Sequence, residues 1–181
     1  MQTFTTDAEE NRYAELQHMA LGFARNGDSQ HLAVMLGAGL PANLADAKGN
    51  SLLMLACYNG EVEATRMLLE HGADVDRRND RGQTPLGGAA FKGYEEIVAL
   101  LLAHGADIDA DNGSGMTPLM FAAMFGRSQV VEQLKAWGAS LERRNRLGIS
   151  AGLIMRLARP ISLIFGRRSP ARCRSVTRSE L

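Results

Sequence analysis

The sequence predicts an all-α solenoid of stacked helix–turn–helix repeats, with a β-hairpin-like finger leading into each repeat. Glycine recurs every 33 residues in three separate frames: Gly49, Gly82, Gly115 and Gly148; Gly27, Gly60, Gly93 and Gly126; and Gly39, Gly72, Gly105 and Gly138. A fixed period of this length marks one supersecondary unit repeated in tandem. One unit alone cannot bury its apolar face, so consecutive units are expected to stack on one another.

The N-terminal part follows this pattern only in outline. Residues 1–12 form an acidic segment, and residues 13–45 keep Gly27, Gly39 and an apolar run over residues 32–36. They lack the residues that start the first helix of the later units. Because a terminal unit faces water on one side, it is expected to be atypical. We therefore predict a degenerate capping repeat over residues 13–45.

Three well-formed repeats of 33 residues are predicted over residues 46–144. A residue that can cap a helix precedes each first helix, at Ser51, Thr84 and Thr117, and Pro85 and Pro118 follow at the first helical position. The glycines at 60, 93 and 126 are placed to end these helices. A second helix then carries apolar residues at helical spacing up to the glycines at 72, 105 and 138.

Each of these repeats opens with a short polar residue three positions before a glycine, at Asp46, Asn79 and Asn112. Such side chains bond to their own backbone, and glycine accepts a positive φ, which together favour a tight turn. We therefore expect each finger to end in such a turn.

The segments Asn79 to Leu86 and Leu100 to Asp109 resemble the ankyrin repeat, and the resemblance recurs in register over about 100 residues. It implies pairs of helices stacked into a slightly curved array, with fingers roughly perpendicular to them. It also implies a role in protein–protein recognition through the finger tips and the concave face of the first helices.

One internal feature departs from the family pattern. The family usually has His after Thr-Pro-Leu, and this chain has Met54, Gly87 and Met120 there. The hydrogen-bond network attributed to that His is therefore expected to be absent. Two adjacent glycines, Gly87 and Gly88, are expected to cost about 1 kcal/mol each relative to Ala within a helix. We predict that this helix is the weak point of the array.

The C-terminal part keeps the register and then loses it. Asn145, Gly148 and Ser150 fit a further unit, but Gly152 stands where the family has Leu. We predict a partial capping repeat over residues 145–165, with Ile149, Leu153 and Leu157 as its apolar stripe. A basic, disordered tail is predicted over residues 166–181. Alternatively, residues 149–181 form a basic amphipathic segment that contacts anionic lipid.

Net charge differs sharply between the two parts of the chain. Residues 1–142 hold 10 Lys+Arg against 19 Asp+Glu, whereas residues 143–181 hold 10 Arg against Glu180 alone. This asymmetry indicates intramolecular docking, an anionic partner or a solvated extension. Nucleic-acid binding is not favoured, because the body is acidic and no aromatic residues are interleaved with the arginines. No secretory signal or spanning segment is recognisable, and we expect a cytoplasmic protein.

The clearest functional pattern is a stripe of large side chains near the end of each first helix. Tyr58, Phe91 and Met124 are spaced by 33 residues, and Phe125 lies beside the last. Such residues are favoured as anchors for a protein partner. The alternative is that they only pack between adjacent repeats and extend the core.

Polar residues are expected to surround this stripe. They are Lys48, Asn50, Arg81, Gln83, Ser114 and Met116 at the finger tips, and Asn59 and Lys92 at the helix ends. A mixed rim around an apolar strip is the usual anatomy of a transient interface. Surface loops are polar in any protein, however, so the same residues also fit a surface without function.

No catalytic, cofactor or metal site is predicted. The sequence has no nucleophile-elbow motif and no phosphate loop, so we expect a non-enzymatic protein without a cofactor. His71 and His104 fit helix C-termini better than a zinc site. The alternating aspartates at 74, 76, 107 and 109 suggest calcium, but the family pattern already places Asp there, and we favour a structural role.

Overall fold

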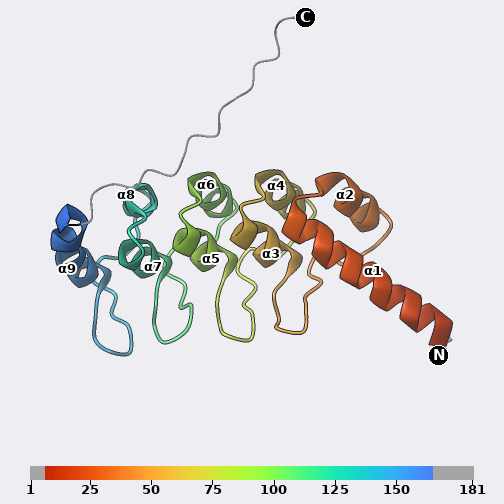
Figure 1. Cartoon of the computed structure of the whole chain (residues 1–181), viewed down its shortest axis with the longest axis horizontal. Helices are drawn as coiled ribbons and strands as arrows, with labels where there is room; N and C mark the ends of the chain where they lie inside the picture. The colour runs from red at the N-terminus through yellow and green to blue at the C-terminus, as the bar shows by residue number, and fades with distance from the viewer. Residues whose placement is uncertain (1–6, 165–181) are drawn as a thin grey trace, which may run out of the picture.

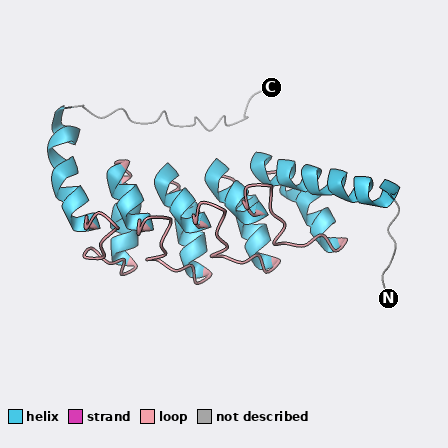
Figure 2. Cartoon of the chain, turned by 90° about the horizontal axis from the view of Figure 1, so that it is seen from below, coloured by secondary structure: helices cyan, strands magenta, loops and turns pink. Residues whose placement is uncertain are grey.

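The computed structural model describes residues 7–164, and the described part is helical. The helices are α1 (Asp7–Asn26), α2 (Ser29–Gly37), α3 (Leu52–Asn59), α4 (Val62–Glu70), α5 (Pro85–Lys92), α6 (Glu95–Ala103), α7 (Pro118–Met124), α8 (Ser128–Ala136) and α9 (Ala151–Ile164). They form two layers of helices stacked side by side, as predicted, with α1 and α9 at opposite ends (Figures 1 and 2). Within the described residues, no helix is both long and apolar enough to cross a membrane.

Four loops project from one side of the array (Figure 1). We call them the first to fourth fingers: residues 38–51, 71–84, 104–117 and 137–150. Isolated β-bridges join Ala45 to Ser51 in the first finger and Arg144 to Ser150 in the fourth. The fingers lead directly into α3, α5, α7 and α9, so their tips stand beside the N-terminal ends of these helices.

The predicted capping residues begin the first helices of the repeats. Ser51 Oγ accepts a hydrogen bond from Met54 N at 3.1 Å, and Thr84 Oγ1 accepts one from Gly87 N, also at 3.1 Å. Thr117 does the same for α7. Each bond satisfies a backbone N–H that has no partner within its own helix. These contacts fix where each first helix starts and hence how the finger joins it.

Glycine is required where these helices end against the next repeat. Gly60 and Gly93 end α3 and α5 with φ of 88° and 89°. A Cβ on Gly60 would lie 2.9 Å from the Tyr94 ring, and one on Gly93 would lie 2.8 Å from Arg127 Cδ. The glycine period therefore reflects both backbone conformation and close contact between repeats.

The core runs continuously along the array. α1 packs on α3, α3 on α5, α5 on α7, and α7 on α9, while α2, α4, α6 and α8 cover them. Leu52, Leu86 and Leu119 recur at 34- and 33-residue intervals and are fully buried. Burial of such a side chain contributes about 1.5–3 kcal/mol. Small residues such as Ala56 and Ala89 let the helices of neighbouring repeats approach closely.

The two ends of the array are built differently from its middle. α1 begins at Asp7 and therefore continues across residue 12, where the sequence suggested the end of an acidic segment. Its C-terminal half buries Ala20 and Ala24, whereas Tyr13 and Met19 are exposed. The division of the chain into capping and internal repeats remains a prediction, and the predicted tail, residues 166–181, lies outside the described residues.

The structure separates the two adjacent glycines of α5. Asn112 is 4% exposed, and its Oδ1 accepts hydrogen bonds from Thr84 N at 2.7 Å and Thr84 Oγ1 at 2.9 Å. Its Nδ2 donates to Ala110 O at 2.9 Å. A Cβ on Gly87 would overlap this amide, whereas one on Gly88 would meet only Tyr58 Cδ2 at 3.5 Å and Met54 Sδ at 3.7 Å. The predicted weakness therefore applies to Gly88, while Gly87 makes room for Asn112.

Carboxylates and an amide link successive fingers at a regular interval. Asp74 N donates to Asn43 Oδ1 at 2.8 Å, and Asp107 N donates to Asp76 Oδ2 at 3.0 Å, one repeat later. Ser140 N makes the corresponding bond to Asp109. The alternating aspartates thus have structural partners. Burial raises the pKa of Asp76, as do the charges of Asp107 and Asp74, against the opposing effect of the Asp107 N–H bond.

The two glycines give a first prediction. Gly88→Ala is expected to raise the free energy of unfolding by about 1 kcal/mol, because alanine favours the helix and space is available. For a chain of this size, that is about 2–4 °C in Tm. Gly87→Ala is expected to lower it by about 1–3 kcal/mol, because Thr84 loses a buried partner. Urea unfolding followed by circular dichroism measures both. A Gly87→Ala variant as stable as the wild type would contradict the assigned role of Asn112.

A second prediction concerns Asp76. Its raised pKa means that the ionised carboxylate destabilises the folded state above that pKa, and that this cost disappears as the group is protonated at low pH. Asp76→Asn keeps an acceptor for Asp107 N and removes the charge. It should raise the free energy of unfolding at pH 7 by no more than about 1 kcal/mol after solvent screening, with a smaller gain near pH 3.

The equivalent position one repeat earlier supplies the control for this change. Asn43→Asp introduces the carboxylate that Asp76→Asn removes, and it should lower the free energy of unfolding at pH 7. Denaturant titrations of both variants at several pH values test the sign. A gain for Asp76→Asn that is equal at pH 3 and pH 7 would exclude the electrostatic explanation.

Candidate functional site

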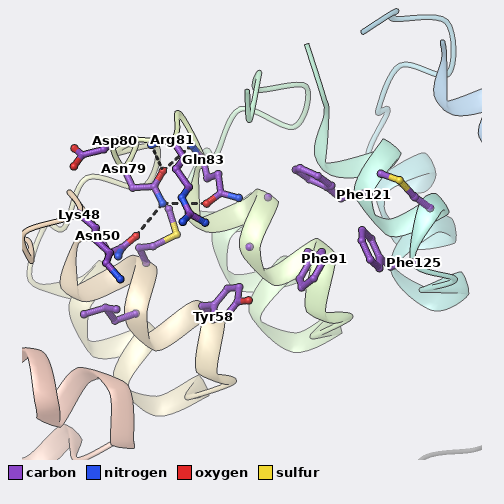
Figure 3. A pocket seen from close by; sticks show the side chains of 15 residues that line it. Lys48, Asn50, Tyr58, Asn79, Asp80, Arg81, Gln83, Phe91, Phe121 and Phe125 are labelled. Atoms are coloured by element: carbon purple, nitrogen blue, oxygen red, sulfur yellow. Dashed lines mark hydrogen bonds between the residues drawn. The ribbon is translucent and has the colours of Figure 1, made fainter. Parts of the chain in front are cut away.

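A groove of ≈ 670 Å³ lies between the fingers and the first helices of three successive repeats (Figure 3). Side chains of α3, α5 and α7 form its apolar floor, and the first and second fingers form a polar wall. The floor residues are Met54, Leu55, Tyr58, Gly87, Gly88, Phe91, Phe121, Met124 and Phe125; those of the wall are Lys48, Asn50, Asn79, Asp80, Arg81 and Gln83. Eight of the twelve residues predicted from the sequence line this groove.

Phe91 is the centre of an aromatic cluster on the floor. Its ring centroid lies 4.4 Å from that of Phe125 at an interplanar angle of 67°, and 6.4 Å from that of Phe121 at 87°. Tyr58 lies on its other side, nearly parallel, at 6.3 Å. Such edge-to-face and offset arrangements are those that aromatic rings prefer. The cluster therefore joins three repeats through side chains that point into the groove.

The stripe predicted from the sequence both packs between repeats and remains accessible. Tyr58 is 43% exposed, Met124 49% and Phe125 45%, although their neighbours on the inner side of the helices are buried. Large apolar side chains that gather at one exposed place are the feature by which interaction sites differ from ordinary surface.

Two residues at the helix ends lie at the edge of the groove. Lys92 Nζ lies 4.3 Å from the centroid of the Tyr58 ring, which is a cation–π contact between α5 and α3. Asn59 Nδ2 donates to Leu55 O at 2.8 Å and so satisfies a carbonyl near the end of α3. Lys92 thus covers part of Tyr58, while Asn59 serves its own helix.

Asparagine and aspartate side chains hold the wall in shape. Asn79 Oδ1 accepts from Arg81 N and Gln83 N, both at 3.0 Å, and Asn79 Nδ2 donates to Asn50 Oδ1 at 2.9 Å in the first finger. These bonds are drawn in Figure 3. They fix both finger tips relative to each other, so that Lys48 and Arg81 project from ordered turns.

Asp46 has the same role in the first finger. Its Oδ1 accepts from Lys48 N at 2.9 Å and Asn50 N at 3.0 Å, and Arg25 Nη2 lies 3.1 Å from its Oδ2. Burial alone raises the pKa of Asp46, but the bonds from Asn50 and Lys48 and the charge of Arg25 outweigh it, and the pKa is lowered. The carboxylate is therefore ionised at neutral pH, when it holds the turn.

The third finger has a different turn. Asp111 Oδ1 accepts from Gly113 N and Gly115 N, both at 2.8 Å, while Asn112 points to the core instead of capping the turn. Ser114 has a φ of 59° and is the single non-glycine residue with positive φ in the described part of the chain. The sequence period alone placed this turn one residue too late.

As a result, the last two predicted rim residues do not line the groove. Ser114 is exposed at the tip of the third finger, and its carbonyl accepts from Arg146 N at 2.9 Å. Met116 is half-buried, and its sulfur accepts from Asn145 Nδ2 at 3.3 Å. Conversely, the sequence analysis missed Phe121. The signal was its position four residues before Phe125, on the same side of α7.

The groups with reactive potential have structural partners. Nδ1 of His71 lies 2.8 Å from Met67 O, and Nδ1 of His104 lies 2.8 Å from Leu100 O, both at helix C-termini. Burial raises the pKa of the Cys57 thiol to about 12, despite the opposing contact with Thr65. A thiol with that pKa is not a nucleophile at neutral pH. Within residues 7–164, no three His, Cys, Asp or Glu side chains gather as a metal site.

Comparison with known proteins agrees with this architecture. A family model described as ankyrin repeats in three copies matches residues 18–112, and a single ankyrin repeat model matches residues 114–146. The chain belongs to the ankyrin repeat family. Ankyrin repeats are generally protein–protein interaction modules. The matched residues include every helix that lines the groove.

A curated ankyrin repeat protein of Pseudomonas aeruginosa is similar over a shorter stretch. It is 49% identical over 49 residues, which is 27% of this chain and 29% of that protein. The similarity thus spans less than a third of either protein, and it concerns the repeat itself.

Proposed function

We propose that this ankyrin repeat protein is a non-enzymatic, cytoplasmic interaction module that binds a partner protein in the groove between its fingers and its first helices. The observation that supports this most directly is the aromatic cluster of Tyr58, Phe91 and Phe125, which combines exposure with contacts across three repeats. Tyr and other large side chains in central positions provide most of the binding energy in protein interfaces.

The order of the groove also favours binding. Phe91 holds Phe125 and Tyr58 in place, and Lys92 adds a contact to Tyr58. The fingers are fixed by the bonds around Asn79 and Asp46. Side chains that are already ordered lose less conformational entropy on association, so more of the contact energy appears as affinity. The apolar floor and polar wall have the arrangement expected of an interface.

The third prediction tests this function. A variant with Tyr58→Ser, Met124→Ser and Phe125→Ser, with or without Phe91→Ser, should lose its partner. Each truncation removes an anchor, and losses of at least tenfold in affinity are expected. Partners are captured on the wild-type chain from the native cell, identified by mass spectrometry, purified and titrated against each variant. Unchanged affinity for the identified partner would refute the proposed site.

A matched control distinguishes the groove from apolar surface in general. Val34 and Leu147 are exposed and lie outside the groove. Val34→Ser with Leu147→Ser should leave the partner's affinity unchanged. Because Phe91 is half-buried, circular dichroism verifies that each variant keeps its helical content, and the triple variant without the Phe91 change supports the same conclusion.

A second candidate function is that of a membrane-surface adaptor, tethered by residues 149–181. The observation that favours it is on α9, where Leu153 is 42% and Leu157 63% exposed close to Arg156. Residues 165–181 of the proposed tether lie outside the described residues. An amphipathic helix with basic residues binds anionic lipid surfaces through such side chains.

Liposome flotation gives the fourth prediction and separates the two candidates. If α9 is a tether, the intact chain should float with phosphatidylserine-containing vesicles, and Leu153→Ser with Leu157→Ser should reduce the floated fraction several-fold. Vesicles of phosphatidylcholine alone are the control. The same result with and without phosphatidylserine, or with and without the two substitutions, would eliminate the tether.

A further inference from the structure

The groove is surrounded by charge of the opposite sign to the body of the protein. Residues 1–142 hold 10 Lys+Arg against 19 Asp+Glu. Four of these cations stand around the groove: Lys48 and Arg81 on its wall, Lys92 above Tyr58, and Arg127, whose Nε donates to Phe91 O at 3.0 Å. Asp80 is the one acidic residue that lines it. The groove is therefore a local basic site on an acidic surface.

These cations are not neutralised by neighbouring carboxylates. Among residues 7–164, the ion pairs of arginine and lysine involve Arg25, Arg66 and Lys135. Lys48, Arg81 and Lys92 take part in none of them. Potentials of partner surfaces are complementary at protein interfaces. Cations that the protein leaves without carboxylate partners around an apolar floor therefore indicate a ligand that supplies the carboxylates.

This charge distribution excludes the protein's own C-terminal segment as the occupant. Residues 143–181 hold 10 Arg against Glu180 alone, and like charges brought together oppose binding. The occupant must be acidic, so the groove fits a segment of another protein better than the tail of this one.

The dimensions of the site favour an extended segment. The floor passes from α3 to α5 to α7, and packed helices are about 8–10 Å apart. An extended chain advances about 3.3–3.6 Å per residue, so about three residues span the step from one repeat to the next. Carboxylates near Lys48 and Arg81 can then alternate with apolar side chains that reach Tyr58 and Phe125.

We propose that the groove binds an acidic, extended peptide segment of the partner protein, with an aromatic or large aliphatic side chain inserted between Tyr58 and Phe125. Its carboxylates pair with Lys48 and Arg81 at the finger tips and with Lys92 and Arg127 at the helix ends. This inference rests on the proposed function and adds the chemical class of the ligand.

Three synthetic fluorescein-labelled peptides test the inference with the full-length protein. The first alternates Asp and Glu with Phe and Leu, the second has Lys in place of every acid, and the third has Ala in place of Phe and Leu. Fluorescence anisotropy should show binding of the first peptide, weaker at high salt, and at least tenfold weaker binding of the other two. Equal affinity for the acidic and basic peptides, or no binding of the first, would overturn the proposal.

Charge reversal then locates the site. Lys48→Glu with Arg81→Glu should raise the Kd of the acidic peptide at least tenfold. Arg77→Glu with Arg78→Glu is the matched control, because both residues are exposed, belong to the same finger as Arg81 and lie outside the groove. The control should change the Kd less than about threefold through long-range charge. Equal losses in the two variants would show general electrostatic attraction and refute this site.

The outcome can be separated from that of the proposed function. If the serine variants lose the natural partner but the acidic peptide does not bind, the groove is the interface and the acidic class is wrong. If the serine variants keep the natural partner, the proposed function itself fails, whatever the peptides do.

Discussion

Every other feature of this protein depends on burial between repeats. A helix such as α5 is short and has little stability by itself, and its Leu86 is fully buried only because α3 and α7 lie on either side. This requirement fixes the inner side of each first helix and the glycines at its end. It leaves the side toward the fingers unconstrained, and there the chain carries exposed Tyr58 and Phe125. The division between scaffold and binding surface thus follows directly from the stacking.

Much of the fold could be predicted because its signals are local and repeated. Ser51 and Thr84 mark helix starts, and Gly60 and Gly93 mark helix ends, through bonds and φ values that each short segment determines for itself. The N-terminal helix was harder to delimit. Only part of α1 packs on the array, so the apolar pattern that reveals the other helices is weak toward Asp7.

The candidate site shows where sequence periodicity stops being informative. The 33-residue spacing brings Tyr58 and Phe91 together because equivalent positions of stacked repeats are neighbours. It does not predict the third finger, where Asp111 forms the turn and Asn112 replaces, across the repeat boundary, a group that Gly87 lacks. That choice depends on a cavity between two repeats, and neither adjacent residue carries a local signal for it. Ser114 and Met116 leave the groove for the same reason.

The altered turn also affects how the finger tips are joined. Asp80 N donates to Lys48 O at 3.1 Å, and Arg146 N donates to Ser114 O at 2.9 Å, whereas Gly113 N is turned to Asp111 within its own finger. The row of tips is thereby divided into two tied pairs, with a seam between the second and third fingers, beside Arg81. A solenoid that bends at such a seam changes the width of its groove while its helical layers stay packed, which makes this boundary the mechanical hinge of the binding face.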